Sequence, residues 1–178
     1  INPVQIKDIP RAKIISQINT LIQKTYLFVG YVEFASYIQR KTGVDESLEL
    51  GEQESKQMEV ENIKKYFNNR LIIVDEVHNI SAVQTNKKNK KTAVALAKLC
   101  KHAENLRLLV LSATPMYNNH KEIIWLTNLL NSVDKRGQIK EEDVFQKDGS
   151  FVEAKNNKES GKDLLRRKLM GYVSYIRG

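Results

Sequence analysis

Apolar and polar positions alternate in blocks along this chain, and the blocks differ in their period. Two short runs, Leu71-Ile72-Ile73-Val74 and Leu108-Leu109-Val110-Leu111, are wholly apolar and lack the polar alternation of a strand with one solvated face. Other segments repeat apolar residues every three to four positions, as amphipathic helices do. The pattern predicts helices at residues 10–24, 32–40, 60–67 and 92–103, and strands at residues 26–29, 70–75 and 107–112.

This alternation of helices and strands predicts an α/β fold with a parallel sheet, because βαβ units give that pattern. We expect the two central strands to be buried on both faces of the sheet, since neither carries polar residues at every second position. The first helix carries its apolar residues on one face, namely Ile14, Ile15, Ile18, Leu21 and Ile22.

Composition favours one globular domain. The chain has 178 residues, of which 41% are hydrophobic and 28% charged, and it contains no apolar stretch of the roughly 20 residues that cross a bilayer. No signal-peptide pattern is present, so we expect a cytoplasmic protein that is neither secreted nor bound to a membrane. The single cysteine, Cys100, lies in a helical pattern beside Leu96 and Leu99, which predicts a packed side chain rather than a catalytic thiol.

Polar residues follow both central strands. Asp75, Glu76 and His78 come after the first, and Ser112 and Thr114 come after the second. Parallel strands present such residues at one edge of a sheet, where α/β folds bind ligands. The arrangement suits magnesium-dependent phosphoryl transfer, with Asp75 on Mg²⁺ through water, Glu76 orienting the attacking water, and the other three linking the two strand ends. The plain alternative is a buried strand followed by a solvated acidic turn.

The sequences LIIVDEVHNI and LVLSATP resemble motifs II and III of superfamily 2 helicases and translocases of the DExH type. The SATPMYNN form and the terminal GYVSYIRG look most like the Snf2-related helicases of large nucleocytoplasmic DNA viruses, a group that includes the poxvirus early transcription factor ATPases. The resemblance implies a RecA-like, P-loop NTPase fold with helices on both faces of the sheet. It also implies hydrolysis of ATP with Mg²⁺ as cofactor.

A phosphate-binding loop is not recognisable in the chain. None of its eight glycines fits G-x-x-x-x-G-K-[ST], and Gly161-Lys162 is followed by Asp163. We therefore expect residues 1–178 to be a partial first RecA lobe of a longer protein, with residues 161–178 forming the end of the lobe and the start of the connection to a second lobe. On this interpretation the parent protein is an ATP hydrolase, and the isolated chain is inactive.

Charge is unevenly distributed around the formal net charge of +8. Between residues 84 and 101 there are six lysines and no acid: Lys87, Lys88, Lys90, Lys91, Lys98 and Lys101. A basic loop here can approach a nucleic-acid backbone, although a solvated loop fits equally well. Residues 45–61 are strongly acidic and predict a flexible surface insertion.

Tyr31 directly follows Gly30. This pair resembles the segment of Snf2-like proteins that lies near nucleic acid, whereas the helical spacing of Tyr31, Phe34 and Tyr37 is more typical of core packing.

The sequence therefore predicts part of a DExH helicase or translocase that acts on double-stranded DNA in viral transcription or replication. Its partners would be the second RecA lobe and the viral transcription machinery, and its place the viral factory or the virion. Two alternatives remain open. One is the translocating ATPase subunit of a restriction enzyme, and the other is a non-catalytic nucleic-acid-binding remnant of a helicase lobe.

Overall fold

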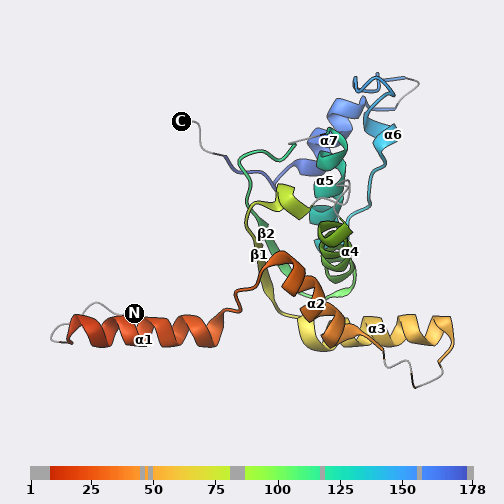
Figure 1. The fold of residues 1–178 in the computed structure, drawn as a ribbon. Helices are drawn as coiled ribbons and strands as arrows, with labels where there is room; N and C mark the ends of the chain where they lie inside the picture. The colour runs from red at the N-terminus through yellow and green to blue at the C-terminus, as the bar shows by residue number, and fades with distance from the viewer. Residues whose placement is uncertain are drawn as a thin grey trace. The chain divides into compact units, whose positions relative to one another are not determined.

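A computed structural model of the chain describes residues 9–44, 47, 50–80, 87–116, 119–155 and 158–175. The chain divides into two units, Ile1–Gly30 and Tyr31–Gly178. The described part is mostly helical and contains a two-stranded parallel sheet in the second unit (Figure 1). The prediction of an α/β fold is thereby confirmed.

The first unit is built around helix α1 (Arg11–Thr25), which matches the helix predicted at residues 10–24. None of its residues is buried. The strand predicted at residues 26–29 is wrong: the backbone is extended at Tyr26, but no ladder forms there with any described residue. Aromatic residues favour strands only where a neighbouring strand accepts their backbone hydrogen bonds.

Two helices begin the second unit, α2 (Tyr31–Thr42) and α3 (Glu52–Phe67). Helix α3 starts eight residues before the helix predicted at residues 60–67, so residues 52–61 are not a flexible insertion. Glu52 and Glu54 lie in its first turn, where negative charge interacts favourably with the helix dipole. The Glu54 carboxylate also accepts the backbone N–H of Gly51 at 3.1 Å. Residues 45, 46, 48 and 49 of the acidic stretch lie outside the described residues.

The sheet consists of β1 (Leu71–Val74) and β2 (Arg107–Val110), with a 3₁₀ turn η3 (Val77–Ile80) and helix α4 (Lys87–His102) between them. The strands are parallel, with Leu71 opposite Arg107 and Val74 opposite Val110. Asn69 and Asn105, shortly before each strand, have left-handed φ values of 58° and 50°, which asparagine tolerates better than most residues. Their side chains join the two strand entries through a 2.8 Å hydrogen bond.

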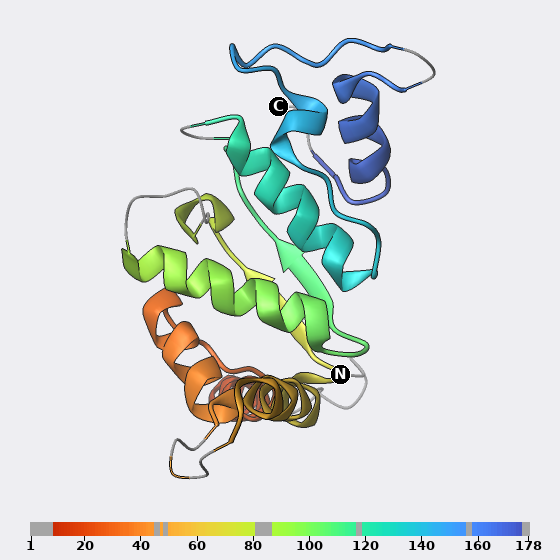
Figure 2. The ribbon, with the colours of Figure 1, turned by 90° about the vertical axis from the view of Figure 1, so that its right-hand side faces the viewer.

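Helices α4 and α5 (Lys121–Val133) cover one face of this sheet (Figure 2). On that face Val74 is buried, and Ile72, Leu108 and Val110 pack against the core. On the other face Leu71, Ile73 and Leu109 are 58%, 50% and 46% exposed. The prediction that both strands are buried on both faces is therefore wrong. An apolar run does not reveal whether a second layer covers it.

The core is formed largely by helix α4, whose Leu96, Leu99 and Cys100 are fully buried. Burial raises the pKa of Cys100 to about 12, so its thiol stays protonated at neutral pH and packs as a small apolar group. This agrees with the sequence prediction for Cys100.

Helices α5, α6 (Glu141–Val144) and α7 (Gly161–Leu169) form the C-terminal part. It is held together by side chains that bond to backbone groups far along the chain. Asn128 bonds both the N–H and the C=O of Ile139, at 2.9 and 2.8 Å. A Cβ atom on Gly161 would lie 2.0 Å from the Val144 carbonyl oxygen, so only glycine allows α7 to begin this close to α6.

Candidate functional site

The two strands end at the same edge of the sheet, as the sequence predicts. Leu111 donates its N–H to the Val74 carbonyl at 2.9 Å, and Val77 donates its N–H to the Leu111 carbonyl at 3.0 Å. These bonds continue the ladder beyond Val74 and Val110. They therefore bring the residues after β1 beside the residues after β2.

The turn after β1 combines exposed carboxylates with buried anchors. Asp75 and Glu76 are exposed, whereas Val77 and Ile80 are 2% and 0% exposed. Asp75 Oδ1 accepts the Glu76 N–H at 3.0 Å. The two apolar side chains fix the turn to the core and leave the carboxylates in solvent.

Glu76 has a φ of +48°, in the left-handed region that a residue with a Cβ atom rarely adopts. Such a conformation costs about 1–2 kcal/mol for an ordinary residue. Backbone strain of this kind often lies at functional sites, where the surrounding structure holds it in place. This conformation therefore supports Glu76 as a functional candidate.

His78 links the two strand ends. Its Nδ1 lies 2.9 Å from Ser112 Oγ and 3.3 Å from Glu76 Oε2. The Ser112 hydroxyl can donate to an unprotonated Nδ1 or accept from a protonated one, so this contact is compatible with both tautomers. The Glu76 contact is favourable only when Nδ1 carries a proton. His78 thus contacts a carboxylate of the first strand end and a hydroxyl of the second.

Ser112 is half-buried and Thr114 is exposed. Ser112 Oγ accepts the Thr114 N–H at 3.1 Å, so the serine bonds to both His78 and the following backbone. Among the described residues, the Thr114 hydroxyl makes no hydrogen bond to the turn from Asp75 to His78. The structure therefore brings Ser112 and His78 together, while Thr114 approaches through its backbone.

Tyr31, a candidate for nucleic-acid contact, lies against this turn. Its hydroxyl donates to the Asp75 carbonyl and lies 3.3 Å from the Glu76 carbonyl oxygen. Its ring packs against the core, as do those of Phe34 and Tyr37, in agreement with the core interpretation of their spacing. The sequence carries no signal for the hydroxyl contact, because Tyr31 and Asp75 are 44 residues apart.

Asn89 also holds the turn, and sequence reasoning did not single it out. Its Nδ2 donates to the Asn79 carbonyl at 2.6 Å. Asparagine within a lysine-rich stretch has the composition of a surface segment, so its contact is visible only in three dimensions.

The basic segment is helical rather than a loop. Lys87, Lys90 and Lys91 lie in the first turns of α4 and are exposed, whereas the side chain of Lys88 lies outside the described residues. No acidic residue lies in the first turn. Positive charge is unfavourable at a helix N-terminus, and an anion bound there would relieve this repulsion.

Two basic residues of α7 have partners within the chain. Arg167 forms an ion pair with Glu159, and Lys168 donates to the Gly137 carbonyl. Residues 176–178, the end of the predicted inter-lobe connection, lie outside the described residues.

The carboxylates of Asp75 and Glu76 fit magnesium in one binding mode only. Among the described residues, no three His, Cys, Asp or Glu side chains are grouped as a metal site. Magnesium commonly keeps several waters and uses one or two carboxylates together with phosphates of the substrate. Two adjacent exposed carboxylates fit that mode but not a cage made by protein alone.

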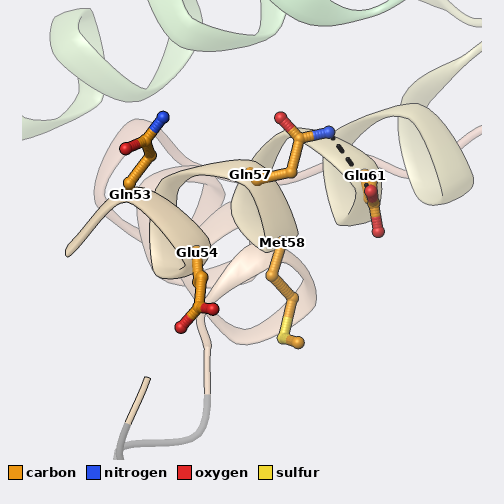
Figure 3. Close-up of a pocket in the computed structure, with 5 residues that line it drawn as sticks. All are labelled: Gln53, Glu54, Gln57, Met58 and Glu61. Carbon is orange, nitrogen blue, oxygen red and sulfur yellow. Dashed lines mark hydrogen bonds between the residues drawn. The ribbon is translucent and has the colours of Figure 1, made fainter. Parts of the chain in front are cut away.

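A hollow of about 560 Å³ lies along α3 and is lined by Gln53, Glu54, Gln57, Met58 and Glu61 (Figure 3). All five side chains come from one face of a single helix, and none comes from the strand ends. The candidate site is therefore an open sheet edge rather than a deep pocket.

Within the described part of the chain, no helix has both the length and the apolar character needed to cross a bilayer.

Comparison with known proteins finds two viral relatives. The chain is 37% identical over 111 residues to a protein of Acanthamoeba polyphaga mimivirus named "Putative ATP-dependent RNA helicase", and the match covers 62% of this chain and 9% of the relative. It is 28% identical over 121 residues to a "Putative helicase" of Frog virus 3, a match that covers 67% of this chain and 12% of the relative. The chain thus spans about a tenth of the length of these relatives. No protein-family model and no solved structure matches it.

Proposed function

We propose that this chain is part of an ATP-dependent helicase or translocase of the DExH type, in a lobe of RecA-like fold. The observation that carries the proposal is the parallel register of β1 and β2, which brings Asp75 and Glu76 beside Ser112 with His78 between them. The helicase names of two viral relatives support it independently. Viral transcription or replication is the proposed setting.

In this proposal the two carboxylates have separate roles. Asp75 would hold Mg²⁺ through water, and Glu76 would orient the water that attacks the γ-phosphate of ATP. Magnesium, when bound, neutralises the charge that develops on the phosphate oxygens. Both carboxylates are exposed at the sheet edge, where a nucleotide can reach them.

His78 and Ser112 would couple the nucleotide site to movement. Because Nδ1 of His78 contacts both Glu76 and Ser112, a change in the position of Glu76 would alter the hydrogen bond to the second strand end. Thr114 joins this path through its N–H to Ser112.

Nucleic acid is the proposed polymer substrate, with Lys87, Lys88, Lys90 and Lys91 contacting its backbone. Double-stranded DNA is favoured by the resemblance to Snf2-related proteins, whereas the name of the mimivirus relative points to RNA. Stimulation of ATP hydrolysis in the full-length protein by each duplex would decide between them.

The deciding experiment is Glu76→Gln in the full-length protein. We expect magnesium-dependent hydrolysis to fall by about 100-fold or more, the usual effect of losing a group that handles the reacting proton, while nucleotide affinity stays within a few-fold. Glu142→Gln, an exposed carboxylate on α6, is the matched control and should change neither.

Equal loss of binding and hydrolysis would make Glu76 a structural residue. A full-length protein without ATP hydrolysis would favour the non-catalytic remnant. Hydrolysis coupled to DNA movement without strand separation would favour a translocase, such as the motor subunit of a restriction enzyme.

A further inference from the structure

The strained turn that carries the two carboxylates is contacted at its start by the side chain of Tyr31. Tyr31 begins helix α2, and its hydroxyl donates to the carbonyl of Asp75 and lies 3.3 Å from that of Glu76. These two carbonyls belong to the peptide groups on either side of the Glu76 Cα atom. Their orientation therefore sets the left-handed φ of +48° at Glu76 and the direction in which its side chain leaves the backbone.

Tyr31 is itself fixed by the core. Its ring packs against the buried cluster, and Thr92, which is fully buried, donates its hydroxyl to the Tyr31 carbonyl at 2.9 Å. Thr92 belongs to α4, so α2 and α4 together position the phenol. Tyr31 is therefore held in place both at its backbone and at its ring. Its hydroxyl can restrain the turn, whereas the hydroxyl of a mobile surface tyrosine cannot.

Backbone bonds hold the peptide group that follows Glu76: its carbonyl also accepts the Asn79 N–H at 2.9 Å, and the Val77 N–H donates to the Leu111 carbonyl at 3.0 Å. The Glu76 N–H is bonded by Asp75 Oδ1, a bond within the turn itself, and Asn89 bonds the carbonyl of Asn79 three residues later. Val77 and Ile80 anchor the far side of the turn in the core. Tyr31 thus adds its hydroxyl at the Asp75 carbonyl, which belongs to the peptide group on the N-terminal side of Glu76.

We propose that Tyr31 is a positioning residue that holds the turn after β1 with Glu76 in its left-handed conformation and so aims the Glu76 carboxylate at the reacting nucleotide. The proposal rests on the function proposed above, in which this carboxylate serves ATP hydrolysis. Burial raises the pKa of Tyr31, and the charges of Asp75 and Glu76 act in the same direction. The phenol therefore remains a hydrogen-bond donor at neutral pH.

The first test is Tyr31→Phe in the full-length protein, with Tyr37→Phe as the matched control. Tyr37 lies on the same helix, and its ring packs edge-on against Phe67 at 6.0 Å. We expect Tyr31→Phe to lower kcat for ATP hydrolysis about tenfold and to leave KM within twofold, because aim matters most in the transition state. Tyr37→Phe should change neither constant, and a kcat within twofold of wild type for Tyr31→Phe would overturn the proposal.

A double-mutant comparison separates positioning from general damage to the fold. In a protein that already carries Glu76→Gln, adding Tyr31→Phe should lower the residual hydrolysis less than twofold, because the group that Tyr31 aims is gone. A full tenfold further loss would mean that Tyr31 acts on the fold rather than through Glu76.

Amide hydrogen exchange tests the same contact without reference to ATP. Tyr31→Phe should speed exchange across residues 75–80 about tenfold, notably at Val77, whose N–H bonds to Leu111, whereas Tyr37→Phe should not. Unchanged exchange overturns the positioning role even if the protein hydrolyses ATP. A response in exchange without any wild-type hydrolysis overturns the proposed function and leaves the positioning of the turn intact.

Discussion

The segments after β1 and β2 both carry polar residues at one edge of the sheet, yet they are built differently. The turn after β1 is fixed by buried Val77 and Ile80 and by hydrogen bonds from Tyr31 and Asn89. The segment after β2 is exposed from Ala113 to Met116. The site therefore has a fixed half and an accessible half, joined by the contact between His78 and Ser112.

The proposed function requires two tasks from the segments after β1 and β2, namely chemistry on a nucleotide and communication with movement. The structural difference between the segments suits one task to each. Chemistry on a nucleotide requires groups that hold their position, because small displacements are costly in rate. Communication requires a segment whose contacts can change at little cost. Substitutions in the fixed half and in the accessible half test whether the two tasks are divided in this way.

The largest expected effect is on the anchor of the fixed half. Ile80→Ala removes a fully buried side chain and should lower the free energy of unfolding by about 2–5 kcal/mol. Met116→Ala, at a position that is 54% exposed in the accessible half, should change it by less than about 0.5 kcal/mol. Urea unfolding of the two variants measures both values. Similar costs would mean that the two segments are anchored alike.

Next in size is the contribution of the lysines that follow the fixed half. Replacing Lys87, Lys88, Lys90 and Lys91 by alanine should weaken nucleic-acid binding alike across sequences. It should also flatten the slope of log affinity against log salt by about 0.9 for each lost phosphate contact on B-form DNA. Fluorescence anisotropy titrations from low to moderate salt measure the slope.

The matched control lies at the other end of the same helix. Lys98 is paired with Glu59 at 2.6 Å, so Lys98→Ala should leave the salt slope unchanged. If the four-lysine variant also keeps the wild-type slope, the first turns of α4 are a solvated surface.

Sequence reasoning succeeded where a pattern is local. The two apolar runs, the helix between them and the burial of Cys100 follow from residue type and period, and the meeting of the two strand ends follows from parallel pairing. It failed where the structure depends on which other segments of the chain pair with a strand or cover it. Residues 26–29 form no strand, and Leu71 and Ile73 are exposed.

The misinterpretation of the acidic stretch has a different cause. Many glutamates suggested flexibility, yet glutamate is a good helix former, and Lys56 and Glu52 form an ion pair one turn apart in α3. The role of Tyr31 was out of reach for a third reason, since a hydrogen bond across 44 residues leaves no periodic trace in a single sequence.

A smaller effect is expected at the contact between His78 and Ser112, which joins the fixed half to the accessible half. Ser112→Ala with Thr114→Ala removes the hydroxyl that bonds His78, at a cost of about 1 kcal/mol for each hydrogen bond lost. In the full-length protein, we expect most ATP hydrolysis to remain and the distance moved per ATP to fall. Parallel assays of hydrolysis and strand displacement on the same preparation measure this ratio. Proportional loss of both activities would make the two residues strand-end packing.

The smallest expected effect concerns the strain stored in the fixed half. Asparagine adopts the left-handed region more readily than glutamate, so Glu76→Asn should raise the free energy of unfolding by up to about 1 kcal/mol while it removes the carboxylate proposed for hydrolysis. Asp75→Asn is the matched control: position 75 has no positive φ, and an asparagine there still accepts the Glu76 N–H, so it should bring no gain in stability. Thermal unfolding of both variants beside the wild type measures the difference. A gain at position 76 alone, together with loss of hydrolysis in the full-length protein, is the pattern of a residue kept for function against its own stability. Equal stability of the two variants would mean that the left-handed conformation of Glu76 stores no measurable strain.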